Sequence, residues 1–182
     1  IPSKVAPAQA ACSPADCGEV IMDRDRWVIR PARPGEHLTL NELAFRSSRQ
    51  IWNYPDDFMA WEPEAIAVKS EYIANNIVSV MEIDGRLVGF SMLRGDPPEI
   101  ELSRLMVEPD SAGKGIGRVL WKHAVATARA LGASVITLDA DPNAEPFYLR
   151  MGAVTVEIAD WEPPMMPGWR LRMMRYEIPP VD

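Results

Sequence analysis

Hydrophobic positions recur along the chain with two different periods, and the changes of period predict an order of helices and strands. Helices are predicted over residues 36–52, 64–76, 115–131 and 143–151, and apolar residues recur at helical spacing most clearly in the first and third of these stretches. Runs rich in β-branched and aromatic residues predict strands at residues 27–30, 78–83, 86–93, 99–107, 135–138, 153–158 and 169–178. Such an order of elements is typical of a mixed α/β sheet in one domain.

Two local signals sharpen this pattern. Asp84 and Gly85 stand between two strand-like runs, and this pair predicts a tight hairpin because both turn positions tolerate positive φ. Gly132 follows the long helical stretch and is expected to end that helix as its C-cap.

The first 25 residues lack both periods. They are rich in Ala, Pro and Ser, so we expect an irregular extension over residues 1–25 and a compact domain over residues 26–182. Cys12 and Cys17 both lie in the extension without a nearby histidine or third cysteine, so free thiols are expected rather than a metal site. No apolar run approaches the roughly 20 residues of a membrane helix, and residues 1–18 show no signal sequence. We therefore expect a cytoplasmic protein that does not enter the membrane.

The formal net charge of -7 bears on the choice of partners. A protein that binds nucleic acid usually presents a basic face, so this balance argues against nucleic acid as a partner. An acidic protein suits cationic small molecules.

The most informative stretch is a glycine-rich loop between a predicted strand and the long helix. Gly113, Gly115 and Gly117 stand on alternate positions where the helix begins, with Lys114 and Arg118 among them. Glycines allow close approach of the backbone, and N–H groups at a helix N-terminus bind anions, so the loop suits phosphate. The spacing excludes a P-loop and the dinucleotide fingerprint, since neither has its required glycines here. The alternative is a turn that serves packing only.

The stretch resembles the coenzyme A motif of the GNAT superfamily of N-acetyltransferases, in which Gln or Arg is followed by two residues, Gly, any residue, and Gly or Ala. Gly115 and Gly117 match its glycines, whereas Ala112 stands where Gln or Arg is usual. Residues 141–153 are similar to the Asn, Ala, Phe-Tyr and Gly series that follows the fifth strand in this family. In element order the resemblance extends from Trp27 to the C-terminus.

The resemblance implies an α/β (α+β) fold with a mostly antiparallel central sheet of six to seven strands and about four flanking helices. It also implies acetyl-CoA as the acetyl donor. By position it assigns the pantetheine arm and the pyrophosphate to the following residues: Leu105, Met106, Val107, Ala112, Gly113, Lys114, Gly115, Ile116, Gly117, Arg118, Asn143 and Phe147. Tyr148 matches the general acid that protonates the thiolate. Glu101 matches a strand glutamate that often serves as the general base, although a solvent-facing charge explains it equally well.

The reaction expected is direct transfer of the acetyl group to a primary amine, because no Cys-His or Ser-His-Asp arrangement offers a nucleophile. The acceptor is expected to be a small amine, a polyamine or an amino-acid-like molecule, held under the aromatic and acidic segment 52–64. A mobile, partly buried loop whose acidic residues face water explains that segment equally well. Two alternatives stay open: acetylation of a protein lysine or N-terminus, and an acyl-CoA sensor without turnover. A homodimer is expected only by analogy with similar folds.

Overall fold

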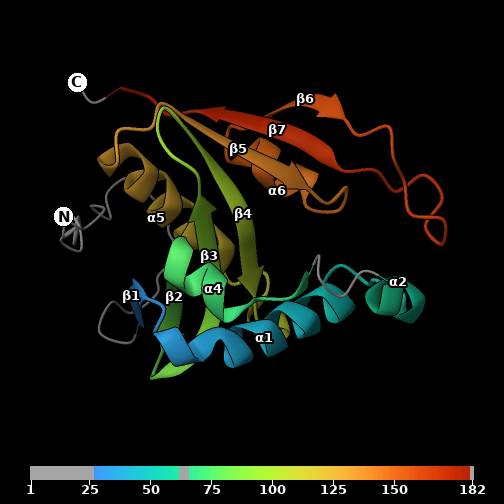
Figure 1. The fold of residues 1–182 in the computed structure, drawn as a ribbon, viewed down its shortest axis with the longest axis horizontal. Coiled ribbons are helices and arrows are strands. Elements are labelled where there is room, and N and C mark those ends of the chain that lie inside the picture. Colours follow the sequence, from blue (N-terminus) through green and yellow to red (C-terminus); the bar gives the residue numbers. More distant parts are fainter. Residues whose placement is uncertain (1–26, 62–65, 181–182) are drawn as a thin grey trace.

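A seven-stranded sheet forms the centre of the molecule (Figure 1). The structure is a computed structural model that describes residues 27–61 and 66–180 of the chain. The strands lie in the order β1-β2-β3-β4-β5-β7-β6. Their bounds are β1 Trp27–Pro31, β2 Ile77–Ile83, β3 Arg86–Arg94, β4 Glu99–Val107, β5 Val135–Ala140, β6 Val154–Ile158 and β7 Arg172–Glu177.

The pairing of β4 with β5 sets the shape of the sheet. These two strands run parallel, whereas every other neighbouring pair is antiparallel. Only three residue pairs join them, Glu99 with Val135, Ile100 with Ile136 and Glu101 with Thr137. Because β4 continues to Val107, its C-terminal half extends beyond the pairing with β5. The sheet is therefore split between its fourth and fifth strands.

Helices cover the two faces of the sheet separately. On one face lie α1 (His37–Gln50), α2 (Asp56–Trp61) and α4 (Ser70–Asn75), and on the other lie α5 (Ile116–Ala130) and α6 (Glu145–Arg150). Two short 3-10 helices, η2 (Pro34–Glu36) and η3 (Pro109–Ser111), precede α1 and follow β4. We refer to the two sides as the α1 face and the α5 face.

Each face has its own hydrophobic core, as the helical spacing of the sequence predicts. On the α1 face, Leu40 and Leu43 pack with Val80 and Phe90 of the sheet. On the α5 face, Leu120 packs near Gly89, where an added Cβ would lie 2.9 Å from Leu120 Cδ1 and 2.8 Å from the carbonyl oxygen of Met106. Helix α5 comes this close to β3 only because residue 89 has no side chain.

The predicted elements are confirmed in order, and the local turn signals hold. The sheet has seven strands, and the hairpin residues Asp84 and Gly85 have φ of 51° and 77°. Gly132 follows α5 with φ of 92°. The predicted extension 1–25, with Cys12 and Cys17, lies outside the described residues.

Three predicted boundaries are wrong. The helix expected over residues 64–76 is not continuous, because residues 67–69 are not helical and α4 begins at Ser70 after the extended Lys69. The segment expected to roof the acceptor contains a helix, α2, which follows Pro55 and carries two acidic residues in its first turn, where they favour a helix N-terminus. The last strand begins at Arg172 rather than at residue 169. Trp169 belongs instead to the preceding loop, where its indole donates a hydrogen bond to Asp141.

Candidate active site

The glycine loop has the backbone that its sequence predicts. Strand β4 ends at Val107, η3 turns the chain, and Gly113 and Gly115 then adopt φ of 75° and 85°. Any other residue would be strained in these two conformations. Helix α5 begins directly after Gly115, so the N–H groups of its first turn point back into the loop. Ala112, Gly113 and Lys114 are exposed, which leaves this N-terminus open to an anion.

Three of the predicted cofactor residues meet although they come from different elements. A Cβ built on Gly117 of α5 would lie 3.5 Å from Cε2 of Phe147 in α6 and 3.8 Å from Cδ2 of Leu105 in β4. The glycine loop and the Phe-Tyr motif are therefore neighbours in space, some 30 residues apart in the sequence.

The split in the sheet lies beside this meeting point. Leu105, Met106 and Val107 belong to the half of β4 that extends beyond its pairs with β5. An extended chain can add to such a strand by hydrogen bonds with its backbone, as a further strand does. This half of β4 can therefore hold the extended arm of a ligand whose phosphates lie at α5.

Tyr148 lies on the α5 face in apolar surroundings. Its side chain is 7% exposed and packs edge to face with Trp121 at 5.6 Å and with Phe147 at 5.0 Å between ring centroids. Burial raises the pKa of the Tyr148 hydroxyl above its ordinary value. The hydroxyl is therefore protonated at neutral pH and able to donate.

Glu101 lies on the opposite face of the sheet from Tyr148. It alternates along β4 with Ile100 and Leu102, which pack in the same cluster as Tyr148. On the α1 face its Oε2 accepts a hydrogen bond of 2.7 Å from Nε of Arg94. The structure therefore does not bring the two predicted catalytic residues together on one face. Groups on the two faces could act on one ligand only through the split.

The sequence did not single out two charged neighbours of Glu101. A β-bulge at Ser103 shifts the register, so that Arg104 lies on the same face as Glu101. Burial lowers the pKa of Arg104. Asp139 of β5 is the second neighbour, and its pKa is raised by partial burial and by the charge of Glu101. An acidic residue inside the apolar run of β5 was the signal that could have identified Asp139.

A buried carboxylate joins three loops at the end of β5. Asp141 is 9% exposed and accepts hydrogen bonds from the Tyr54 hydroxyl at 2.6 Å, Trp169 Nε1 at 2.9 Å and the Asn143 backbone N–H at 2.6 Å. Burial and the charge of Asp141 raise the pKa of Tyr54. Phe58 packs against Tyr54 at 4.8 Å and against Trp169 at 5.7 Å between centroids. We call these four side chains, Tyr54, Phe58, Asp141 and Trp169, the aromatic node.

The two acidic residues of the predicted roof that the structure describes, Asp56 and Asp57, have local partners. Asp56 pairs with Arg49 at 2.5 Å, and Asp57 Oδ1 accepts the backbone N–H of Phe58. Within residues 27–61 and 66–180, no group of three His, Cys, Asp or Glu side chains could hold a metal ion. In the same part of the chain, the helices are too short or too polar to cross a bilayer.

Fold and site together define a protein with a split mixed sheet and, after its central strand, a glycine loop that leads into an open helix N-terminus. The model of a family described as the acetyltransferase (GNAT) family matches residues 40–153. The match spans more than half of the chain, so the chain belongs to this family, whose cosubstrate is acetyl-CoA.

Individual relatives agree with this assignment. An uncharacterized N-acetyltransferase of Mycobacterium bovis is 38% identical over 73 residues, which are 38% of this chain and 47% of the relative. A GCN5-related N-acetyltransferase of Rhodopseudomonas palustris superposes with a TM-score of 0.71 at 24% identity, covering 88% of this chain and 99% of that one. The PaiA N-acetyltransferase of Thermoplasma acidophilum, in complex with coenzyme A, gives a TM-score of 0.67 at 21% identity, over 83% and 98% of the two chains.

The chain spans about half the length of the first curated relatives that it matches. The solved structures are below 25% identity, so they establish the fold.

Proposed function

We propose that this protein transfers the acetyl group of acetyl-CoA directly to a primary amine of a small molecule. The observation that carries the proposal is the split between β4 and β5, which begins after only three residue pairs and has the glycine loop at one strand's end and the Phe-Tyr motif after the other. At the split, groups on the two faces of the sheet can reach the same ligand. The donor would approach from the α5 face and the amine from the α1 face.

The residues around the split fit acetyl-CoA. The positive φ of Gly113 and Gly115 and the open N-terminus of α5 suit the pyrophosphate, with Ala112, Lys114, Ile116, Gly117 and Arg118 beside it. The backbone of Leu105, Met106 and Val107 would pair with the pantetheine arm and polarise the acetyl carbonyl. Phe147 and Asn143 would line the arm from the other side. The structure of the Thermoplasma protein was determined in complex with coenzyme A, which supports coenzyme A as a ligand of this fold.

The chemistry needs no covalent enzyme intermediate. The neutral amine nitrogen attacks the thioester carbon, a tetrahedral oxyanion forms, and the C–S bond then breaks to give the acetylated amine and the CoA thiolate. Tyr148 donates a proton toward that sulfur, and the raised pKa of Tyr148 keeps the proton on the phenol until the thiolate develops. The proton removed from the attacking nitrogen leaves toward the α1 face.

Two carboxylates on the α1 face are candidates for the general base. Glu101 is engaged by Arg94 through one oxygen, so it would accept a proton directly only if that contact loosened, or through water from its other oxygen. Asp139 has a raised pKa, which makes it a stronger base than an ordinary aspartate once it is ionised. We therefore retain Glu101 as the candidate expected from sequence and add Asp139 as its competitor.

A small acceptor is supported by the aromatic node and by the acidic balance of the chain. The rings of Tyr54, Phe58 and Trp169 cluster with a buried carboxylate at the end of β5, close to where the amine would approach. A net charge of -7 favours cationic over anionic molecules. A cytoplasmic location, a homodimer and the domain bounds 26–182 stay predictions from the sequence.

The test is an acetyl-transfer assay with the full chain, acetyl-CoA and a panel of amines that includes polyamines, amino acids and lysine peptides. CoA release is followed together with the mass of the acetylated product. Turnover of a small amine, lowered about 10²-fold or more by Tyr148→Phe without weaker acetyl-CoA binding, is the expected result. Tyr176→Phe is the matched control, because that ring also packs on Trp121. Turnover of peptides alone would reassign the acceptor, and full activity of Tyr148→Phe would remove the tyrosine from the mechanism.

A further inference from the structure

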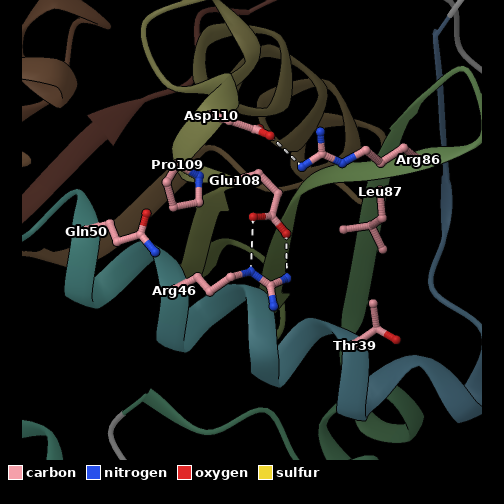
Figure 2. A pocket seen from close by; sticks show the side chains of 8 residues that line it. All are labelled: Thr39, Arg46, Gln50, Arg86, Leu87, Glu108, Pro109 and Asp110. Carbon is pink, nitrogen blue, oxygen red and sulfur yellow. Dashed lines mark hydrogen bonds and ion pairs between the residues drawn. The ribbon is translucent and has the colours of Figure 1, made fainter.

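An arginine on the amine side of the sheet reaches the turn from which the glycine loop starts. Glu108 directly follows β4 and precedes η3, and its side chain is only 8% exposed. Arg46 of α1 donates to both of its oxygens, from Nη2 to Oε1 at 2.6 Å and from Nε to Oε2 at 3.2 Å (Figure 2). The pair spans 62 positions of the sequence. A two-point contact of this kind fixes the orientation of the carboxylate as well as its position.

The turn that follows Glu108 is ordered by its own backbone. The N–H of Glu108 bonds to the carbonyl oxygen of Val88 at 2.8 Å, and the N–H of Ser111 bonds to the carbonyl oxygen of Glu108 at 2.9 Å. Asp110 accepts the Ser111 hydroxyl and pairs with Arg86 of β3, but that ion pair is exposed. Of the two ion pairs in this turn, the one made by Arg46 therefore has the buried carboxylate.

We propose that Arg46 is a positioning residue that holds the glycine loop ready for acetyl-CoA. The inference rests on the proposed function, since it assigns the loop to that ligand. Glu108 is four residues before Ala112, so a shift of its carboxylate moves the start of the loop. A binding loop that is already ordered before the ligand arrives binds more tightly, because less conformational entropy is lost on binding.

The surroundings of the pair explain why the arginine should matter more than its own exposure suggests. Arg46 and Glu108 line a surface hollow of about 420 Å³, and the Arg46 side chain is 42% exposed. Removing Arg46 therefore opens no closed cavity in the core. It does leave the nearly buried carboxylate of Glu108 without its bidentate partner. We expect the turn to rearrange so that water can reach this carboxylate.

The same helix end also reaches the second cofactor motif. Four residues after α1 ends at Gln50, Tyr54 bonds to Asp141, two positions before Asn143. Helix α1 is thus tied to the glycine loop through Arg46 and to the loop before α6 through Tyr54. The segment after α1, on the amine side, and the acetyl-CoA site are therefore connected through one helix. Binding of either substrate should raise the affinity for the other.

The experiment uses Arg46→Ala, Arg46→Lys, Glu108→Gln and the double variant Arg46→Ala/Glu108→Gln in the full chain. Arg49→Ala is the matched control, because Arg49 lies on the same helix and makes an exposed ion pair with Asp56 (61% and 83% exposed). Acetyl-CoA affinity is measured by calorimetry well below each melting temperature, and amide hydrogen exchange of residues 112–117 is measured without ligand.

The expected result is an affinity about tenfold weaker for Arg46→Ala, an intermediate loss for Arg46→Lys and no change for Arg49→Ala. The double variant should lose no more than the worse single variant, because the two side chains act as one pair. Faster exchange of the loop amides should accompany the loss. Unchanged affinity and exchange in Arg46→Ala would overturn the proposal. If the unmodified chain fails to bind acetyl-CoA, the proposed function falls, while the exchange data still decide whether Arg46 orders the loop.

Discussion

The hydroxyl of Tyr54 donates a 2.6 Å hydrogen bond to the carboxylate of Asp141, from a position 87 residues away in the sequence. This bond connects the segment after α1 with the loop between β5 and α6. Trp169 donates to the same carboxylate oxygen from the loop before β7, so three separate connections meet on one buried charge. The structure around the end of β5, beside the split, is therefore stabilised by a hydrogen-bond network as well as by hydrophobic packing.

Removing the Tyr54 hydroxyl is expected to destabilise the fold. Tyr54→Phe keeps the ring against Phe58 but leaves Asp141 with one donor fewer, and a hydrogen bond to a charged group contributes about 1.5 to 3 kcal/mol. The measurement is the free energy of unfolding in urea, with Tyr176→Phe as the control that should change it little. A loss equal to that of the control would mean that water replaces the hydroxyl at no cost.

Alkaline titration should distinguish the buried tyrosines. The chain has four, and burial raises the pKa of Tyr54 and of Tyr148 above the ordinary value of about 10. For these groups the folded state holds protons that the unfolded state releases, so their contribution to stability is complete below about pH 10 and is lost as pH rises further.

Absorbance at 295 nm followed between about pH 10 and 12 should therefore show fewer than four tyrosinates while circular dichroism still reports folded protein. The rest should appear as the chain unfolds. Ionisation of all four in the folded chain at about pH 10 would contradict the burial of Tyr54 and Tyr148.

Asp139 and Glu101, the two candidate bases, should differ in how their substitution changes the pH dependence of kcat. If Asp139 is the base, Asp139→Asn lowers kcat about 10²-fold or more and removes the acidic limb of the pH–rate profile. In the unmodified enzyme this limb should lie above the ordinary range for aspartate, because the pKa of Asp139 is raised and a base must be ionised to act. Glu101→Gln would then change kcat less, and it should shift the limb downward, because the charge that raises the pKa of Asp139 is gone. The reverse pattern of losses would return the role to Glu101.

Placing arginine at position 112, where the motif that the loop resembles has Gln or Arg, is expected to tighten acetyl-CoA binding. Ala112 is exposed and has φ of -64° and ψ of 148°, a conformation that any residue adopts. Ala112→Arg should lower the Kd for acetyl-CoA about twofold to fivefold, as an exposed ion pair with phosphate would. Ala112→Glu should raise it, and both effects should shrink at high salt. An unchanged Kd in both variants would place the phosphates away from residue 112.

Much of the fold could be predicted because its signals are local. The Asp84-Gly85 turn, the glycines that need positive φ and the apolar stripe of α5 each lie within a few positions of the sequence. The glycine loop and the Phe-Tyr motif were recognisable for the same reason, and their contact through Gly117 and Phe147 follows once both are placed on the sheet.

The remaining features depend on residues that are distant in sequence or on short elements. Helix α2 has six residues, too few for a hydrophobic period to be visible. No pattern shows that β4 and β5 pair at three positions only, or that a bulge at Ser103 turns Arg104 to the side of Glu101. Likewise, Arg46 with Glu108 and Tyr54 with Asp141 are ordinary polar residues until the fold brings them together.

Acetyl-CoA binding at the glycine loop can be tested directly by thermal unfolding. Melting temperatures of the full chain and of Gly115→Ala are measured with acetyl-CoA, CoA or ATP at millimolar concentration. Because a ligand that binds only the folded state raises the melting temperature, acetyl-CoA and CoA should each stabilise the unmodified chain. ATP should not, and the shift should be smaller in Gly115→Ala, whose residue 115 is strained at φ of 85°. No shift with acetyl-CoA, or an equal shift with ATP, would contradict the assignment of the loop to coenzyme A.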